Sequence, residues 1–523
     1  MDGFLVKGKP FFPIGAQAHN SSSYSKKELG NAVRAALLAG CNTLEAPVYW
    51  NIVEPQEGVF DFSMAKDMID LCRHNGLKLI VLWFASWKNG EMHYCPDYIK
   101  KDTERFKRVL SAESVPVWDL SLFCEDNRDA DARAFAGLMA FLRKYDEQEQ
   151  TVIAVQVQNE PGTLRTDKDY SPAARKAHLE DVPGELISFL RKEPPCEARS
   201  IWEKNGTLEE GSWGECFGLR GPELCEAMAM AKYIDHVAAA GKAEYDLPML
   251  VNVWVAEHPW RVPGINYPSG GAIPLTLPVW KWAAKSIDII APDIYTQNYE
   301  HYKKLCDIYD RPDNPLMVPE SSSSAKNARY LFYAVGNKNC VGYSIFGAES
   351  MLNDDGGLLE RCRPLADSFH SLRAALPLLY RYRGTGRIHS VVQDYDIPSD
   401  FYEFERYIGC VPYIASGPRD LRRDYRNPTP EIGEPWQRGL IFEAAPDLLY
   451  LAGNFNLRLS PKSSPAWNLV DRDMQACEFL SVEEGHFDES GEFVCDRRRN
   501  GDEVVFGGFW VTTACKVVRV KLL

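Results

Sequence analysis

The chain has 523 residues, a net charge of −14 and a hydrophobic fraction of 45%. These values are ordinary for a globular protein and exclude a largely disordered or fibrous chain. The longest basic run is the arginine triplet at 497–499, which argues against a nucleic acid or an anionic membrane as partner. Ten of the 13 tryptophans precede residue 283, a density that suggests a surface on which ligands stack.

Cysteine usage and the first residues bear on location. The 14 cysteines are scattered singly, without a CxxC pair or a zinc-binding spacing. The N-terminal residues lack the basic and apolar regions of a signal peptide, and no apolar run of about 18 residues could span a membrane. We therefore expect reduced thiols, a cytoplasmic location and no bound metal.

Short apolar runs alternate along the chain with amphipathic stretches. In chain order the pattern predicts a strand at 11–16, a helix at 26–39, a strand at 43–50, a helix at 63–75, a strand at 77–84, a helix at 130–145, a strand at 152–158, a helix at 222–240, strands at 249–255 and 287–290, a helix at 299–309, a strand at 316–318, a helix at 327–335 and a strand at 341–346. Eight strands separated by helices predict an α/β fold, the (β/α)₈ TIM barrel. An open doubly wound sheet is the alternative, but no Gly-rich phosphate-binding turn follows the first strand.

The spacing of these elements also predicts the domain organisation. Two connections, at 88–128 and 162–221, are unusually long and both follow strands, so we expect them as insertions at the rim of the barrel. Helical spacing fades after 365–379, and short alternating runs with hairpin-turn residues follow. We predict a catalytic barrel at 1–380 and a β-rich accessory domain at 381–523, folded as a β-sandwich.

Two glutamates, Glu160 and Glu320, stand at the ends of the fourth and seventh predicted strands. In a barrel of this kind the functional residues lie at the C-terminal ends of the strands, and these two strands face each other across the ring. Two carboxyl groups about 5–5.5 Å apart are the arrangement of a retaining glycosidase. A single glutamate at a strand end is more often a salt-bridge partner or a helix cap, so the hypothesis depends on the pair.

Other strand ends carry side chains suited to binding sugars. Amides, a lysine and carboxylates can hydrogen-bond hydroxyl groups, and aromatic rings stack on sugar faces. The candidate substrate-binding residues are Gln17, His19, Asn20, Tyr49, Trp83, Lys88, Asn159, Trp254, Asp293, Tyr295 and Glu349. Trp83 and Trp254 are the preferred tryptophans, although core packing is an alternative role for each, and His19 is equally suited to a structural hydrogen bond.

Several segments carry a resemblance to a known family. They are residues 9–15, 42–50, 54–62, 156–162, 291–295 and 319–320. With these segments the chain resembles the clan A retaining glycoside hydrolases, and within that clan the β-galactosidases of families 35 and 42. The resemblance implies Glu160 as acid/base and Glu320 as nucleophile, and the C-terminal part is similar to the β-sandwich appendage of a bacterial family 35-like subgroup.

The chain departs from both families in detail. The acid/base motif of typical family 35 members reads Glu-Asn-Glu-Tyr-Gly, whereas residues 158–162 here read Gln-Asn-Glu-Pro-Gly, and the cysteine zinc cluster of many family 42 members is absent. The expected activity is that of a cofactor-free, retaining exo-β-glycosidase, with a β-galactoside or an oligosaccharide as substrate and β-galactosidase as the favoured activity. A β-glucosidase or β-mannosidase with the same residues, and a non-catalytic carbohydrate-binding barrel, stay open, as does assembly into a homo-oligomer.

Overall fold

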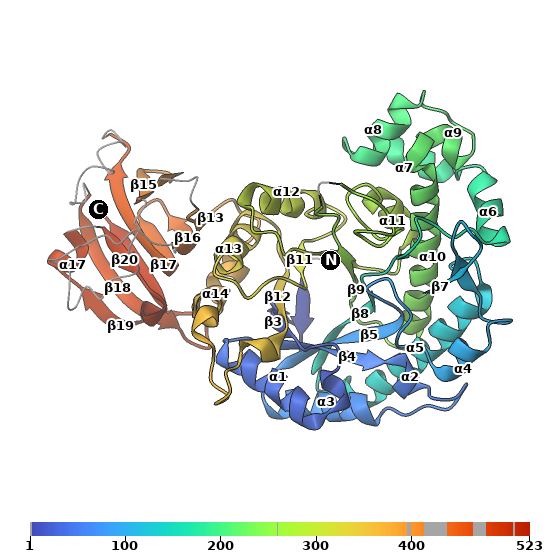
Figure 1. The fold of residues 1–523 in the computed structure, drawn as a ribbon. Coiled ribbons are helices and arrows are strands. Elements are labelled where there is room, and N and C mark those ends of the chain that lie inside the picture. Colours follow the sequence, from blue (N-terminus) through green and yellow to red (C-terminus); the bar gives the residue numbers. More distant parts are fainter. Residues whose placement is uncertain (1–2, 259, 395–398, 413–436, 464–476, 506–507) are drawn as a thin grey trace.

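The computed structural model describes residues 3–258, 260–394, 399–412, 437–463, 477–505 and 508–523. A barrel surrounded by helices forms the larger part, and a sheet domain made by the C-terminal residues lies at one side of it (Figure 1). Among the described residues, no helix has the length and apolar character needed to cross a membrane.

Eight parallel strands form the barrel, as the sequence predicts. In chain order they are β3 (Ile14–Gln17), β4 (Thr43–Tyr49), β5 (Lys78–Lys88), β8 (Val152–Asn159), β9 (Met249–Trp254), β10 (Ile289–Asp293), β11 (Met317–Val318) and β12 (Gly342–Phe346). They are hydrogen-bonded in the order β10-β9-β8-β5-β4-β3-β12-β11. A parallel bridge between Ile294 and Ser321 joins the two ends of this series and closes the ring.

Helices surround this ring because each has one apolar face to bury. They are α1 (Lys26–Leu38), α2 (Trp50–Val53), α3 (Ser63–His74), α5 (Glu125–Asp146), α10 (Gly221–Glu244), α11 (Leu277–Ala283), α12 (Tyr299–Tyr309), α13 (Asn327–Asn337) and α14 (Arg363–Tyr382). Helix α1 illustrates how the sequence sets the two ends of such a helix. Ser25 caps its N-terminus by accepting a hydrogen bond from the Glu28 N–H, and Gly40, with φ of +83°, ends the turn after it.

The long connections carry structure of their own. Residues between β5 and α5 form α4 (Asp97–Lys101), β6 (Arg108–Leu110) and β7 (Pro116–Leu120). Residues between β8 and α10 form α6 (Pro172–Leu179), α7 (Gly184–Lys192), α8 (Glu197–Lys204) and α9 (Trp213–Phe217). Figure 1 shows both groups together at the end of the barrel far from the C-terminal domain. A short hairpin, β1 (Phe4–Val6) with β2 (Lys9–Phe11), precedes the barrel, so the strand predicted at 11–16 begins three residues later.

The C-terminal residues form a separate antiparallel domain, which confirms the predicted change of architecture. Its strands are β13 (Ile388–Val392), β14 (Ser399–Glu403), β15 (Tyr407–Pro412), β16 (Arg438–Ala445), β17 (Leu448–Pro461), β18 (Phe479–Phe487), β19 (Phe493–Arg499), β20 (Phe509–Val511) and β21 (Val517–Leu522). All nine are connected by hydrogen bonds, because the long β17 pairs with β16 and β21 over its first half and with β20 and β15 over its second. The domain boundary predicted at 380 stays a prediction; α14 ends at Tyr382 and β13 begins at Ile388.

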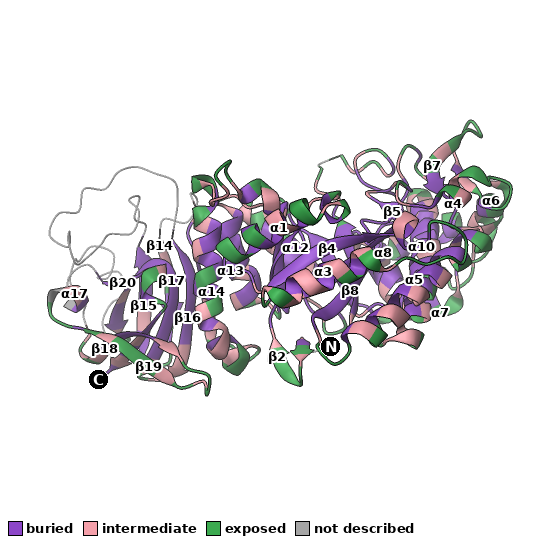
Figure 2. Ribbon diagram, turned by 90° about the horizontal axis from the view of Figure 1, so that it is seen from below, coloured by how far each residue is buried: buried purple, intermediate pink, exposed green. Residues whose placement is uncertain are grey.

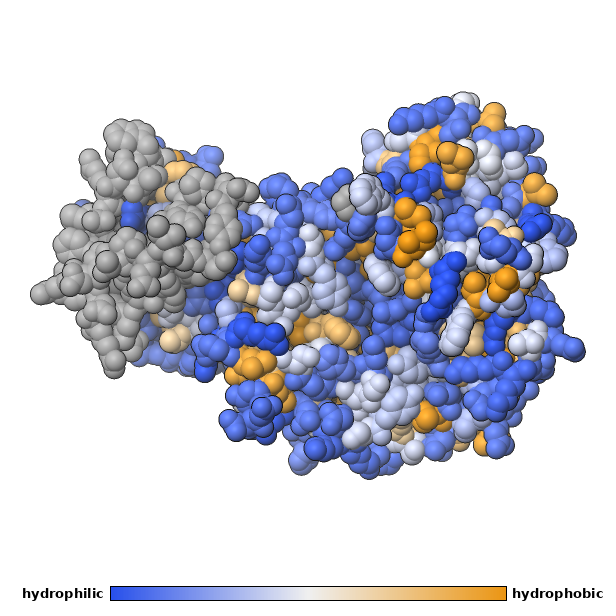
Figure 3. All heavy atoms as spheres, in the orientation of Figure 1, coloured by the Kyte–Doolittle hydropathy of each residue, from blue (hydrophilic) through white to orange (hydrophobic). Residues whose placement is uncertain are grey.

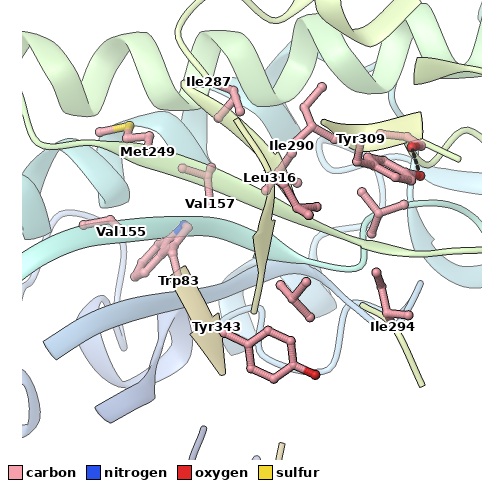
Figure 4. Packing of buried hydrophobic residues seen from close by; sticks show 14 of the residues in the cluster. Trp83, Val155, Val157, Met249, Ile287, Ile290, Ile294, Tyr309, Leu316 and Tyr343 are labelled. Carbon is pink, nitrogen blue, oxygen red and sulfur yellow. Dashed lines mark hydrogen bonds between the residues drawn. The ribbon is translucent and has the colours of Figure 1, made fainter. Parts of the chain in front are cut away.

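Buried apolar side chains fill both the ring and the space between ring and helices. In Figure 2 the strands of the barrel are coloured as buried along most of their length. Figure 4 shows part of the space outside the ring, where Trp83, Val155 and Val157 lie among other buried residues. The two domains also pack closely. A Cβ added at Gly336 of α13 would lie 2.9 Å from Cδ2 of Leu440 in β16, so the helix approaches this strand closely. Outside these cores, the face shown in Figure 3 is mainly hydrophilic, with small separate hydrophobic patches.

Candidate active site

The end of β8 places Glu160 at the mouth of the barrel. Every residue of β8 is buried, and the backbone then leaves the extended conformation, with φ of +65° at Gln158 and +44° at Glu160. A left-handed conformation costs a residue other than glycine about 1–3 kcal/mol and is concentrated at functional sites. The Glu160 N–H donates a hydrogen bond of 2.8 Å to Oδ1 of Asn252, at the end of the neighbouring β9.

Glu320 follows β11 on the opposite side of the ring. Its carbonyl oxygen accepts a hydrogen bond of 2.9 Å from the Ile294 N–H, beside the bridge that closes the barrel. Four neutral donors surround its buried carboxylate. Oε1 accepts from Nε2 of Gln17 at 3.0 Å, Nδ2 of Asn159 at 3.2 Å and Nδ2 of Asn252 at 3.2 Å, and Oε2 accepts from the Tyr295 hydroxyl at 2.7 Å. Both oxygens of Glu320 are therefore held in place by hydrogen bonds from neutral groups.

A third carboxyl group, that of Asp293 at the end of β10, completes the cluster. One oxygen from each of Glu160, Asp293 and Glu320 lies within 4.8 Å of the other two. Glu160 and Asp293 share a side-chain hydrogen bond, and Oδ2 of Asp293 accepts another, of 2.8 Å, from Nδ2 of Asn252. One oxygen of Glu160 therefore lies within 4.8 Å of one oxygen of Glu320, which is compatible with the separation of about 5–5.5 Å between the carboxyl groups of a retaining glycosidase.

Burial and mutual repulsion govern the protonation of this cluster. Burial, followed by the charge of Glu320, raises the pKa of Glu160 to about 7. Burial also raises the pKa of Asp293 well above its usual value, and the charges of Glu320 and Glu160 add to the effect. Lys88, whose Nζ donates a hydrogen bond of 2.7 Å to Oδ1 of Asn159, opposes both increases. At neutral pH, the pair of Glu160 and Asp293 therefore still holds a proton beside Glu320.

The three carboxyl oxygens are also close enough to reach one cation. The same oxygens of Glu320 already accept hydrogen bonds from four donors, and acidic clusters are common without a metal. The absence of metal and cofactor stays a prediction.

Five of the predicted substrate-binding residues therefore gather around the two glutamates. They are Gln17, Asn159, Asp293, Tyr295 and Lys88. Trp254, at the end of β9, is 36% exposed, and its role in stacking on a sugar stays a prediction.

A second group of predicted residues lies around the ends of β3, β4 and β12. The His19 N–H donates to Oε2 of Glu349 at 3.1 Å, and its ring nitrogen Nε2 is 2.7 Å from the Ser350 hydroxyl. The Tyr49 hydroxyl donates to the carbonyl oxygen of Asn20 at 2.6 Å. Tyr49 is completely buried, with its ring stacked on those of Tyr24 and Tyr94. These contacts link His19 with Glu349 and Tyr49 with Asn20, and the substrate-binding role of these four residues stays a prediction.

The structure does not bring Trp83 to the site. Its side chain is completely buried among other apolar residues outside the ring (Figure 4). There its Nε1 donates a hydrogen bond of 2.8 Å to Oδ1 of Asp131 on α5. Successive side chains of a strand point to opposite faces, and the side chain of Trp83 is one of those that point out of the ring. The prediction of a sugar-stacking role for Trp83 is replaced by a packing role.

Three buried polar residues were missed. Asn252 contacts Glu160, Asp293 and Glu320, and its place at a strand end beside Trp254 could have indicated this. Glu45 lies in the middle of the apolar β4, where a lone charge is itself unusual. Asp131 belongs to a surrounding helix, and nothing in the local sequence distinguishes it from a solvent-facing residue.

An eight-stranded barrel with paired glutamates at the ends of opposite strands is the architecture expected of a glycoside hydrolase. Comparison with known proteins agrees. Residues 19–182 match a family model described as "Beta-galactosidase", and residues 365–509 match a model described as a domain of unknown function. The predicted resemblance to β-galactosidases is thereby confirmed.

Individual relatives match over limited lengths. A β-galactosidase of Xanthomonas manihotis is 29% identical over 193 residues, which cover 34% of this chain and 28% of that protein. Beta-galactosidase 13 of Arabidopsis thaliana is 34% identical over 89 residues, 15% of this chain and 10% of that protein. Among solved structures, a β-galactosidase from Marinomonas ef1 is 11% identical with a TM-score of 0.49, covering 71% of this chain and 61% of that one. The catalytic domain of a β-amylase from Paenibacillus polymyxa is 10% identical, also with a TM-score of 0.49, covering 67% and 96%.

Proposed function

We propose that this protein is a retaining exo-β-glycosidase, with β-galactosidase as its activity. The observation that carries the proposal is the convergence of Glu160 and Glu320, whose oxygens lie within 4.8 Å of each other although the residues are 160 positions apart (320 − 160). The family match over residues 19–182 supports galactose as the sugar. The long inserted segments at the rim would narrow the approach, which favours attack at a chain end.

In the first step, a carboxylate oxygen of Glu320 attacks the anomeric carbon while the bond from that carbon to the leaving oxygen breaks. Glu160 donates its proton to the leaving oxygen, so the aglycone departs as a neutral alcohol. The four neutral donors orient the Glu320 carboxylate for this attack without neutralising it by a direct ion pair. The product is a glycosyl ester of Glu320.

In the second step, Glu160 changes from acid to base because Glu320 is now part of a neutral ester. Burial and the charge of Glu320 together raise the pKa of Glu160, and the ester carries no negative charge, so the second of these contributions is removed. Glu160, now a carboxylate, takes a proton from a water molecule as the water oxygen attacks the anomeric carbon. The ester bond breaks, Glu320 returns to the carboxylate form, and the sugar leaves with its original β configuration.

The compartment and the domain division belong to the same proposal. All 14 cysteines are unpaired, which supports a reducing, cytoplasmic location. We place the catalytic unit at 1–380 and the accessory domain at 381–523, with the carbohydrate as the partner.

The test uses Glu160→Ala and Glu320→Ala with an aryl β-galactoside. Each substitution should lower turnover by orders of magnitude. Azide should restore Glu160→Ala with a β-galactosyl azide as product and Glu320→Ala with an α-galactosyl azide, because azide replaces water in one case and the nucleophile in the other. Turnover close to that of the wild type in either variant would reject the assignment. A panel of nitrophenyl galactosides, glucosides and mannosides identifies the preferred sugar.

A further inference from the structure

Asp131 is a buried carboxylate that the proposed mechanism does not use. It lies on α5, outside the ring of strands, and has no exposed surface. Three donors converge on it: Nε1 of Trp83 at 2.8 Å on Oδ1, with the Ser86 hydroxyl at 2.5 Å and Nε2 of Gln158 at 2.7 Å on Oδ2. Tyr233, from α10, contacts the Ser86 hydroxyl at 3.0 Å and completes the polar surroundings.

Gln158 connects this carboxylate with the active site. Its Nε2 donates to Asp131, and its Oε1 accepts a hydrogen bond of 3.0 Å from the Trp87 N–H at the end of β5. The amide is therefore fixed at both ends. Its backbone has φ of +65°, a conformation that its surroundings must maintain. Glu160 is only two residues further along the chain, so the direction of its side chain depends on this turn.

The same network holds the neighbouring strand end. Lys88 follows Trp87, and its Nζ donates to Oδ1 of Asn159, while the Asn89 N–H donates to the Asn159 carbonyl oxygen at 3.1 Å. A shift of Gln158 would therefore move Asn159 and Glu160 together, and would alter their relation to Lys88.

We propose that Asp131 is a positioning residue for the acid/base group: through Gln158 it maintains the left-handed turn that directs Glu160 toward the leaving oxygen. This inference rests on the proposed function. A glutamate in place of Gln158 could not donate to Asp131 and would bring two carboxylates together, so the glutamine and the aspartate form a matched pair.

The chemistry of the pair suggests the substitutions. Asp131→Asn keeps the side-chain volume but leaves only one acceptor oxygen. The NH₂ group of the new asparagine must then face either Trp83 Nε1 or Gln158 Nε2, which are themselves donors, so one hydrogen bond is lost. Adding Gln158→Glu removes that conflict, because the new carboxylate accepts from the amide and from the Trp87 N–H. Gln158→Met removes both hydrogen bonds at similar volume. Leu138→Ala, at a buried position further along α5, is the matched control for loosened packing.

The readout is kcat/KM for aryl β-galactosides that differ only in the leaving group. A poor leaving group such as phenol needs the proton of Glu160, whereas 2,4-dinitrophenol departs without it. Asp131→Asn and Gln158→Met should each lower kcat/KM for the phenyl galactoside by about 100-fold, the loss expected from a displacement of about 1 Å. The 2,4-dinitrophenyl galactoside should lose less than about 3-fold, since general acid catalysis contributes little there. Asp131→Asn with Gln158→Glu should recover the phenyl galactoside to within about 10-fold of the wild type.

Each outcome has a definite meaning. Leu138→Ala should lower kcat/KM equally for the two substrates. The same equal losses in Asp131→Asn or Gln158→Met would overturn the inference. It would also be overturned if the double variant, shown to be folded by circular dichroism, did not recover activity on the phenyl galactoside. If Asp131→Asn does not fold, Gln158→Met decides the question by the same two substrates. Glu160→Ala is measured alongside. If it lacks the leaving-group dependence, the proposed function fails; if it shows the dependence and the Asp131 and Gln158 variants do not, only the positioning role fails.

Discussion

Glu45 should make the stability of the barrel depend on pH. The residue lies in the middle of β4, completely buried inside the ring, where its Oε1 accepts a hydrogen bond of 2.6 Å from the Ser344 hydroxyl. Burial raises its pKa from 4.5 to about 8, against the effect of Ser344, and the charge of Glu320 adds to the increase. The native protein therefore keeps a proton on Glu45 at neutral pH.

The sign and size of the effect follow from the two pKa values. Between about pH 5 and pH 8 the unfolded chain has lost this proton and the native protein has not, so unfolding releases a proton and the free energy of unfolding falls as pH rises. Each pH unit contributes about 1.4 kcal/mol, which amounts to about 4 kcal/mol over three units. Below about pH 4.5 both states are protonated and the effect disappears.

Glu45→Gln isolates this contribution, because glutamine keeps the acceptor for Ser344 and stays neutral at every pH. The variant and the wild type should have similar stability at pH 5, and the variant should be more stable at pH 8 by up to about 4 kcal/mol. The assay is urea unfolding followed by tryptophan fluorescence at pH 5, 6.5 and 8. Glu104→Gln, at an exposed position, is the control and should show no such trend. An equal loss of stability in Glu45→Gln at pH 5 and pH 8 would refute the reasoning.

Three further predictions concern the active site. Tyr295→Phe removes the 2.7 Å hydrogen bond to Glu320 and should lower kcat/KM by about 10–100-fold. This loss corresponds to about 1.5–3 kcal/mol, the usual contribution of a hydrogen bond to a charged group. Thermal unfolding checks that the variant is folded. Lys88→Met removes a positive charge that lowers the pKa of Glu160, so the alkaline limb of the kcat/KM profile should move to higher pH; a limb that stays in place would contradict the assignment of Glu160 as the acid. Incubation with EDTA and dialysis should leave the rate unchanged, and a loss restored by a divalent cation would assign a metal to the three carboxylates.

The barrel could be predicted from the sequence because its strands are continuous apolar runs that end in polar residues. A strand buried on both faces reads in this way, and β8 is buried throughout. The same rule located Glu160 and Glu320, since each is the first carboxylate after such a run. Segment ends were less predictable. β5 continues to Lys88, beyond the expected end at residue 84, because its last residues pair with the end of β8 after an irregularity between Trp83 and Lys88.

The direction of side chains could not be predicted from the sequence alone. Alternation along a strand separates two faces, but both faces of a barrel strand are apolar, so the pattern does not distinguish the inside of the ring from the outside. Trp83 faces α5 and its neighbours Leu82 and Phe84 face the inside of the ring, as alternation requires, but the apolar pattern does not show which of the two faces is the inner one. The pairing of Asp131 with Gln158 joins a helix to a strand across 27 positions and depends entirely on how the two pack.

The difference between Glu160 and Glu320 originates in their neighbours, since the two side chains are chemically identical. Glu320 receives four hydrogen bonds from amides and a hydroxyl, all neutral groups, which stabilise a negative charge without removing it. Glu160 is buried beside that charge, and the pKa of its carboxyl group rises as a result. Lys88 donates a hydrogen bond to Asn159, whose amide in turn donates one to Glu320. Replacing one of the neutral donors by a cation would hold Glu320 in an ion pair and weaken the repulsion that keeps Glu160 protonated, so both halves of the reaction depend on the neutrality of these donors.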